Sequence, residues 1–152
     1  MKSDFPALLT PGLHRLTLED IHSLAVHPFP EDVRRARLYS RLAVWASELR
    51  SCGVTGTLWL DGSFLTAKPE PEDIDCILWN PDWTHATNLT SEVRQQLERL
   101  LDKTSAKRGF GLDLYIEKPA ETEVIHRQAY WRGFFGYCHD QVTAKGLAEV
   151  GI

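Results

Sequence analysis

Three aspartates inside short apolar runs restrict the fold of this chain more than any other feature of its sequence. Two lie in the run DIDCI at residues 73–77, and the third lies in GLDLYI at residues 111–116. Aspartate is disfavoured in β-strands, so an aspartate within a strand-like run needs a specific reason. Because side chains alternate along a strand, Asp73 and Asp75 share one face while their apolar neighbours face the core. The same alternation places Asp113 opposite a core face made by Leu112, Leu114 and Ile116.

If the two strands are neighbours, these three carboxylates converge, and their convergence is costly without a cation. Two carboxylates 4 Å apart repel by about 4 kcal/mol at an effective dielectric constant of about 20. Either one carboxyl is protonated or a metal ion lies between them. An all-oxygen ligand set suits Mg²⁺ or Mn²⁺. Asp73, Asp75 and Asp113 are therefore predicted to be both the catalytic residues and the metal ligands, with solvated strand-edge carboxylates as the alternative.

The hydrophobic pattern predicts an α/β or α+β fold, in which helices pack against a small mixed sheet. Apolar spacing and capping signals indicate helices over about 17–26, 31–50 and 91–103, and strands over 55–61, 73–79 and 110–117. We expect a turn at 80–82, a helix or irregular segment through Tyr130 and Trp131, and a short strand at 147–152. The length of 152 residues and this order of elements favour a single domain spanning 1–152.

A second motif precedes the first two aspartates. Gly62 and Ser63 begin a loop over 62–72, and a glycine there lets a phosphate approach the backbone closely. The Gly-Ser pair, its nine-residue spacer, the DID run and the later LDL run together resemble the signature of the polymerase-beta-like nucleotidyltransferase superfamily, over about residues 54–117. The flanking PGLH at 11–14 and YWRG at 130–133 resemble an uncharacterised family of small bacterial nucleotidyltransferase-like proteins.

The resemblance implies a nucleotidyltransferase-like fold and a divalent-metal-dependent transfer of a nucleoside monophosphate from a nucleoside triphosphate to an acceptor hydroxyl. It implies that Gly62 and Ser63 hold the triphosphate and that Asp73 and Asp75 ligate the bridging ions. Asp113 would complete the second metal site and help to activate the acceptor, which stays open between a protein, an RNA and a small molecule. Minimal nucleotidyltransferases of toxin–antitoxin modules also lack a helical second domain, but their usual arginine soon after the serine is missing from residues 64–68.

Basic side chains are the other candidates for contact with the phosphates. Lys68 lies in the loop between the two motifs, and Arg132 lies between Trp131 and Gly133. We predict that both bind the nucleotide, although a solvated loop lysine is the alternative for Lys68, and Lys145 is a weaker candidate. A further set of arginines is expected to form a solvated flank of the helix over 31–50: Arg34, Arg37 and Arg41.

Charge and cysteine content restrict the class of protein. The formal net charge of −4 argues against a protein that depends on non-specific nucleic-acid binding. No stretch is apolar enough to span a membrane, so no membrane partner is expected. The three cysteines are widely spaced, which argues against a zinc site or a disulfide framework and favours reduced thiols in a cytoplasmic protein.

Two other functions remain open from the sequence. In the first, the domain is a catalytically weak binding module, an antitoxin or a nucleotide sensor, that acts through a protein partner. In the second, the same carboxylates serve a water molecule in a metal-dependent nuclease or phosphohydrolase. The intact set of three carboxylates argues against the binding module, and the Gly-Ser motif with its spacing argues against the nuclease or phosphohydrolase.

Overall fold

The computed structural model of the chain describes residues 4–84 and 89–152. Its helices are α1 (Leu18–Ala25), α2 (Val33–Ser51), α3 (Ser91–Leu101), α4 (Lys103–Phe110) and α5 (Val124–Phe135). Its strands are β1 (Gly12–Arg15), β2 (Thr55–Asp61), β3 (Ile74–Asp82), β4 (Leu112–Glu117) and β5 (Gly146–Gly151). Two short 3-10 turns, η1 (Ser63–Leu65) and η2 (Glu121–Glu123), follow β2 and precede α5.

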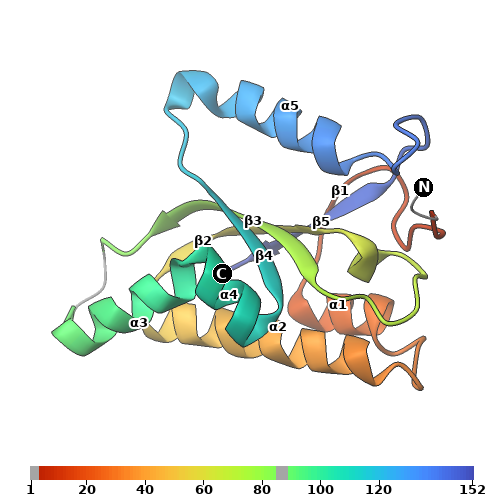
Figure 1. The fold of residues 1–152 in the computed structure, drawn as a ribbon. Helices are drawn as coiled ribbons and strands as arrows, with labels where there is room; N and C mark the ends of the chain where they lie inside the picture. The colour runs from red at the N-terminus through yellow and green to blue at the C-terminus, as the bar shows by residue number, and fades with distance from the viewer. Residues whose placement is uncertain (1–3, 85–88) are drawn as a thin grey trace.

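The five strands of the described residues form one mixed sheet in the order β1-β5-β2-β3-β4 (Figure 1). β2 and β3 are antiparallel neighbours joined by the loop that begins with the Gly-Ser pair. β3 and β4 are parallel, because the connection between them passes through α3 and α4 before it returns to the sheet. The neighbour relation between the two aspartate-bearing strands, on which the sequence analysis depended, is therefore present.

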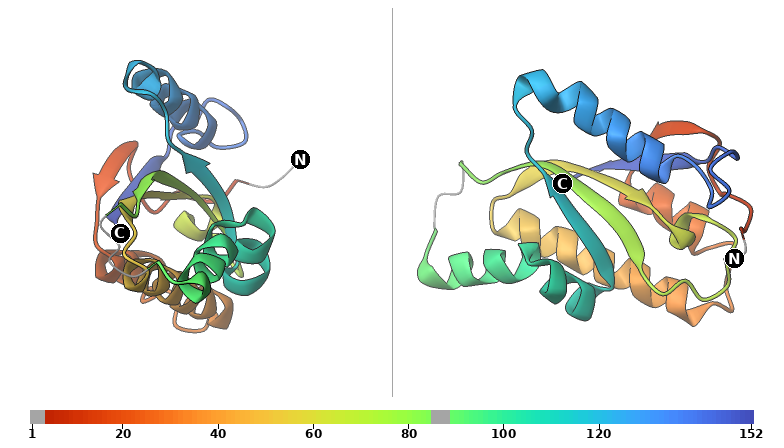
Figure 2. Two further views of the ribbon diagram at one scale, coloured as in Figure 1. Left: turned by 90° about the vertical axis from the view of Figure 1, so that its left-hand side faces the viewer. Right: turned by 45° about the horizontal axis from the view of Figure 1, so that its top comes forward.

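Helices cover the two faces of the sheet unequally. α1, α2, α3 and α4 lie on one face, and α5 lies on the other (Figures 1 and 2). The larger hydrophobic core lies on the four-helix side, where Leu42 and Trp45 of α2 are fully buried. A smaller apolar cluster joins the opposite face to α5 and consists of Trp59, Ile77, Trp79, Trp131, Phe135 and Leu147. The predicted combination of a small mixed sheet with helices packed against it is confirmed at this level.

Local signals account for the first two helices. The Thr17 hydroxyl accepts a hydrogen bond from the Asp20 N–H, and the Asp20 carboxylate accepts one from the Thr17 N–H, which makes the expected capping box of α1. The Asp32 carboxylate caps α2 in the same way through the Arg35 N–H at 3.1 Å. The predicted apolar stripe of α2 is buried against the sheet.

The helix predicted over 91–103 is wrong in its extent, because two helices lie between β3 and β4. α3 ends at Leu101, and α4 begins at Lys103 after a single extended residue, Asp102 (φ −72°, ψ 127°). The Asp102 carboxylate accepts a hydrogen bond from the Ser105 N–H at 2.8 Å and so begins a second helix in place of a loop. Gly111 ends α4 in the left-handed conformation (φ 70°), so β4 begins at 112 rather than at the predicted 110.

Two smaller expectations also fail. Residues 80–82 were expected to form a turn, but β3 continues to Asp82 past Asn80, which has a positive φ of 48°, and the pairing with β2 shifts register nearby. This irregularity accommodates Pro81, which has no N–H for the ladder. Ile116 was expected in the core but is 43% exposed, because it lies near the end of the edge strand β4. The expected helix near Tyr130 and the final strand are present as α5 and β5.

Cys52, Cys76 and Cys138 are buried free thiols that form no disulfide. Among the described residues, every helix is too short or too polar to cross a membrane.

Candidate functional site

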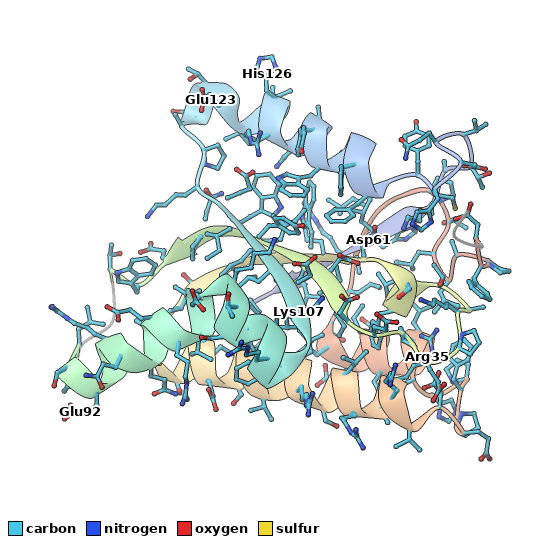
Figure 3. All side chains as sticks on the ribbon, in the orientation of Figure 1. Arg35, Asp61, Glu92, Lys107, Glu123 and His126 are labelled. Carbon is cyan, nitrogen blue, oxygen red and sulfur yellow. The ribbon has the colours of Figure 1, made fainter. Side chains whose placement is uncertain are left out.

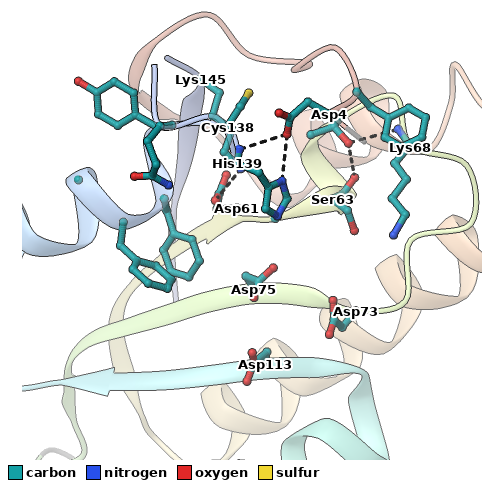
Figure 4. Close-up of a pocket in the computed structure, with 18 of the residues that line it drawn as sticks. Asp4, Asp61, Ser63, Lys68, Asp73, Asp75, Asp113, Cys138, His139 and Lys145 are labelled. Atoms are coloured by element: carbon teal, nitrogen blue, oxygen red, sulfur yellow. Dashed lines mark hydrogen bonds and ion pairs between the residues drawn. The ribbon is translucent and has the colours of Figure 1, made fainter. Parts of the chain in front are cut away.

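Strand pairing aligns three aspartates in a row at one end of strands β2, β3 and β4. Asp61 at the end of β2 pairs with Asp75 on β3, and Asp75 pairs in turn with Asp113 on β4. Neighbouring side chains on one face of paired strands have Cβ atoms about 5 Å apart. Figure 4 shows this row, with Asp73 beside it where the loop enters β3. The alternation along each strand therefore becomes a cluster of carboxylates on the face that α5 covers.

The same face divides into an apolar part and an acidic part. The row next to the aspartates contains Trp59, Ile77 and Tyr115, which pack in the small cluster beneath α5. The row beyond it includes Glu117, whose carboxylate accepts hydrogen bonds from Arg127 and from Trp131 Nε1. These contacts attach α5 to one end of the face, so the carboxylate row at the other end borders an open pocket.

Asp75 lies at the centre of the row and is the most perturbed of the predicted site residues. Burial, together with the negative charges of Asp73, Asp61 and Asp113, raises the pKa of Asp75 to about 6. Both causes disfavour the ionised form, and a bound cation would offset both. A carboxyl in this state is typical of a functional site, although structural clusters of charge produce the same effect.

Gly62 gives the Asp75 carboxylate the space that it occupies. Gly62 follows Asp61 with φ of 83° and ψ of −166°, a conformation essentially restricted to glycine. A Cβ atom at this position would overlap Asp75 Oδ2 and lie 2.9 Å from Asp75 Cγ. The absence of a side chain at Gly62 therefore leaves room for the Asp75 carboxylate, and it would also let a phosphate approach the backbone.

We expect Gly62→Ala to lower the free energy of unfolding by roughly 2–4 kcal/mol. Between 1 and 3 kcal/mol comes from the disallowed backbone conformation, and the remainder comes from displacing the Asp75 carboxylate. The measurement is urea unfolding of both proteins. Gly109→Ala on α4 is the control, because a Cβ atom there meets nothing within 4 Å and alanine is the better helix former. Equal stability of the Gly62→Ala variant and the wild type would show that the loop adapts without cost.

Two lysines of α4 neutralise the outer aspartates. Lys107 forms an ion pair with Asp73, and Lys103 Nζ lies 3.3 Å from Asp113 Oδ1. Lys103 also lies over the Tyr115 ring, 3.8 Å from its centroid. Figure 3 shows Lys107 beside the strands at the edge of the sheet. With these pairs in place, no three acidic, histidine or cysteine side chains of the described residues are gathered closely enough to hold a metal ion.

Asp61 is the most buried carboxylate of the row and has a lysine of its own. It is 2% exposed, and Lys145 Nζ lies 3.1 Å from its Oδ2 atom. This contact is an ion pair without the angles of a good hydrogen bond. Burial raises the pKa of Asp61, while Lys145 and the Gly62 N–H oppose that rise. Lys145, on the approach to β5, therefore contributes its charge to the inner end of the row.

The carboxylates form one side of an open pocket of about 1040 Å³. Six of the predicted site residues line it: Gly62, Ser63, Lys68, Asp73, Asp75 and Asp113. Arg132 does not line this pocket. It lies at a smaller neighbouring hollow, and its guanidinium group is 5.5 Å from the centroid of the Trp59 ring. Lys145 borders both hollows.

Sequence reasoning missed three charged residues of the site: Asp61, Lys103 and Lys107. The alternation that placed Asp75 also puts Asp61 on the face of Trp59, so the sequence carried a signal for it. Lys103 and Lys107 could not be predicted, because α4 was not expected. No pattern within the sequence pairs a helix residue with a particular strand carboxylate.

The geometry defines an α+β domain. Its pocket lies at one end of the sheet and is lined by carboxylates, three of which form ion pairs with lysines. The chain belongs to a family described as a family of unknown function (DUF6932), whose model matches residues 2–151. No curated protein and no solved structure matches the chain.

Proposed function

We propose that this protein is a nucleotidyltransferase that uses Mg²⁺ or Mn²⁺ to transfer a nucleoside monophosphate from a nucleoside triphosphate to an acceptor hydroxyl. The register that aligns Asp61, Asp75 and Asp113 beside the Gly62-Ser63 turn is the observation that carries the proposal. The finer fold assignment, a nucleotidyltransferase-like domain, is part of the same proposal and rests on the motif resemblance together with this register.

The residues of the pocket fit a divalent ion in their chemistry. All of the candidate ligands are carboxylate oxygens, which Mg²⁺ and Mn²⁺ prefer. Burial and the neighbouring carboxylates raise the pKa of Asp75, and a bound cation would offset both causes. Asp73, Asp75 and Asp113 would hold the ion if their carboxylates exchanged the contacts with Lys107 and Lys103 for a shared cation and moved closer together. When bound, the ion would neutralise the charge that develops on the phosphates.

The chain's own groups have separable tasks in this reaction. Ser63 and the backbone amides after Gly62 would bind the triphosphate, and Lys68 would add a charge at the same side of the pocket. The acceptor oxygen forms a bond to the α-phosphorus, the bond between the α-phosphorus and the bridging oxygen breaks, and pyrophosphate leaves. The acceptor's proton would pass to a carboxylate of the row, for which Asp113 is our candidate.

We expect a nucleoside triphosphate with Mg²⁺ to raise the unfolding temperature of the protein by several degrees. A ligand at a hundred times its dissociation constant adds about 2.7 kcal/mol of stability, and each kcal/mol shifts the midpoint by roughly 2–4 °C at this size. Scans with each of the four triphosphates, with and without Mg²⁺ or Mn²⁺, measure the shift. Transfer of label from the α-phosphate to an acceptor separates the proposal from a phosphohydrolase, which releases labelled phosphate products into water.

The lysine ion pairs favour one other function, the binding module that acts through a protein partner. Lys103 and Lys107 balance Asp113 and Asp73 without any metal, as a scaffold that no longer needs an ion would require. If the module is an antitoxin, we expect no shift of the unfolding temperature with any nucleotide or metal; a nucleotide sensor would shift with a nucleotide but transfer no label. The binding module also predicts a stable complex with one partner that survives purification from the native cell.

A further inference from the structure

Aromatic side chains of α5 form a wall of the same pocket that the Gly-Ser turn and the carboxylates line. Tyr130 and Phe134 line this pocket, although they are 52% and 57% exposed. They are four residues apart and so lie on one side of the helix. Their rings are parallel to within 15°, with centroids 6.2 Å apart. Two adjacent aromatic rings that are about half exposed give the pocket an apolar surface that a ligand can cover.

The orientation of Phe134 is fixed before any ligand arrives. Trp131 and Phe135 lie edge-on to its ring, at centroid distances of 5.9 and 5.0 Å. These two residues are themselves buried against the sheet in the small apolar cluster. A side chain that is held in place loses little conformational entropy on binding, so Phe134 is a preorganised platform.

The pocket is open beside Gly133 of α5. Gly133 also lines the pocket, and a Cβ atom at its position would meet no atom within 4 Å. A glycine inside a helix costs roughly 0.5–1 kcal/mol relative to alanine, and no packing contact explains it here. The pocket therefore combines an acidic floor, a Gly-Ser turn and an unobstructed aromatic wall.

We propose that Phe134, with Tyr130 beside it, is the platform on which the base of the bound nucleoside triphosphate stacks. This inference rests on the proposed function, because it assigns the base to the wall of the pocket whose floor would hold the triphosphate. Stacking on an aromatic face is available to every base, so the subsite provides affinity more than selectivity. Trp59 and Trp79, which also lie on this face of the sheet, are buried beneath α5 and closed to a ligand. Tyr115 lines the pocket, but Lys103 lies over its ring.

The test compares a nucleoside triphosphate with inorganic triphosphate, both with Mg²⁺, as titrated by calorimetry. We expect Phe134→Leu to weaken binding of the nucleotide on the order of tenfold and to leave binding of inorganic triphosphate unchanged. Phe134→Tyr, which keeps the ring, should restore the affinity. Ile125→Ala is the matched control, because Ile125 is an apolar residue of the same helix that is 79% exposed and lies outside the pocket lining.

Each alternative has a distinct result. Equal nucleotide affinity in Phe134→Leu and the wild type overturns the platform while leaving the nucleotidyltransferase proposal intact. An equal loss for inorganic triphosphate also overturns it, because the ring then supports the shape of the pocket. If Phe134→Leu changes the particle mass measured by sedimentation and leaves nucleotide affinity unaltered, the aromatic wall is a contact surface for a second copy of the chain. Failure of the wild type to bind any nucleotide removes the proposed function and this inference together.

Discussion

Replacing Asp75 with asparagine is expected to lower the rate of nucleotidyl transfer by roughly a thousandfold and to make the metal-free protein more stable. The loss of rate follows because a divalent ion supplies several kcal/mol of transition-state stabilisation, and each 1.36 kcal/mol is a factor of ten. The gain in stability follows because a buried, mutually repelling charge is removed. Label transfer from the α-phosphate and urea unfolding at pH 7.5 measure the two effects.

The raised pKa of Asp75 also predicts the direction in which stability changes with pH. The pKa of Asp75 is about 6 in the folded protein, against about 3.9 in an unfolded chain. The folded state therefore binds the proton more tightly, so the carboxyl lowers stability as the pH rises from about 4 to about 6, and this loss persists above that window. Two pKa units correspond to at most about 3 kcal/mol, which is the expected advantage of Asp75→Asn over the metal-free wild type at neutral pH.

Mg²⁺ and a distant carboxylate serve as controls for this effect. Added Mg²⁺ should stabilise the wild type above pH 6 and leave Asp75→Asn nearly unaffected. Glu98→Gln, an exposed substitution on α3, should change neither the rate nor the stability by more than about 0.5 kcal/mol. An unaltered rate in Asp75→Asn would refute the enzymatic proposal. A stability difference that stays constant from pH 4 to pH 7 would refute the account of the buried charge.

Strand periodicity alone was enough to predict the face on which the aspartates lie. The alternation around Asp75 and Asp113 depends only on local backbone geometry, and the structure confirms both placements. The role of Asp61 depends on its pairing with Asp75, a contact between separate strands that no local pattern specifies. Arg132 lies away from the larger pocket because of its position around α5, which the weak pattern after residue 119 could not define.

The buried arginine of α2 shows a signal that was present and was not used. Leu38, Leu42 and Trp45 define a helical stripe that extends back to Arg35, so the spacing alone indicated burial. The sequence analysis considered only its exposed neighbours, Arg34, Arg37 and Arg41, as a solvated flank, and those three are exposed. Burial of this guanidinium group is possible because backbone carbonyls of α1 and of the loop after β2 accept its hydrogen bonds, and sequence spacing cannot reveal those contacts.

Arg35→Met is expected to cost about 3–5 kcal/mol of stability, which corresponds to roughly 10 °C in unfolding temperature. The Arg35 side chain is fully buried, and its guanidinium group donates to the backbone carbonyls of Ala25, Phe64, Thr66 and Lys68. Methionine fills a similar volume but leaves these buried carbonyl oxygens without a donor, at about 1–3 kcal/mol for each one that stays dry. Arg34→Met, an exposed change on the same helix, is the control and should stay within about 0.5 kcal/mol of the wild type.

The loss of Arg35 should also weaken ligand binding in the pocket, because three of its four carbonyl partners belong to the loop that carries the Gly-Ser turn and Lys68. Leu42→Ala separates this effect from general destabilisation, since a cavity in the main core costs a comparable amount, about 2–5 kcal/mol, and removes none of the hydrogen bonds that Arg35 donates to the loop. At a temperature where both variants are folded, calorimetry should detect weaker binding of the Mg²⁺–nucleotide complex in Arg35→Met and wild-type binding in Leu42→Ala. Equal affinities in the two variants would mean that the loop holds its shape through its own contacts, and Arg35 would then matter for stability alone.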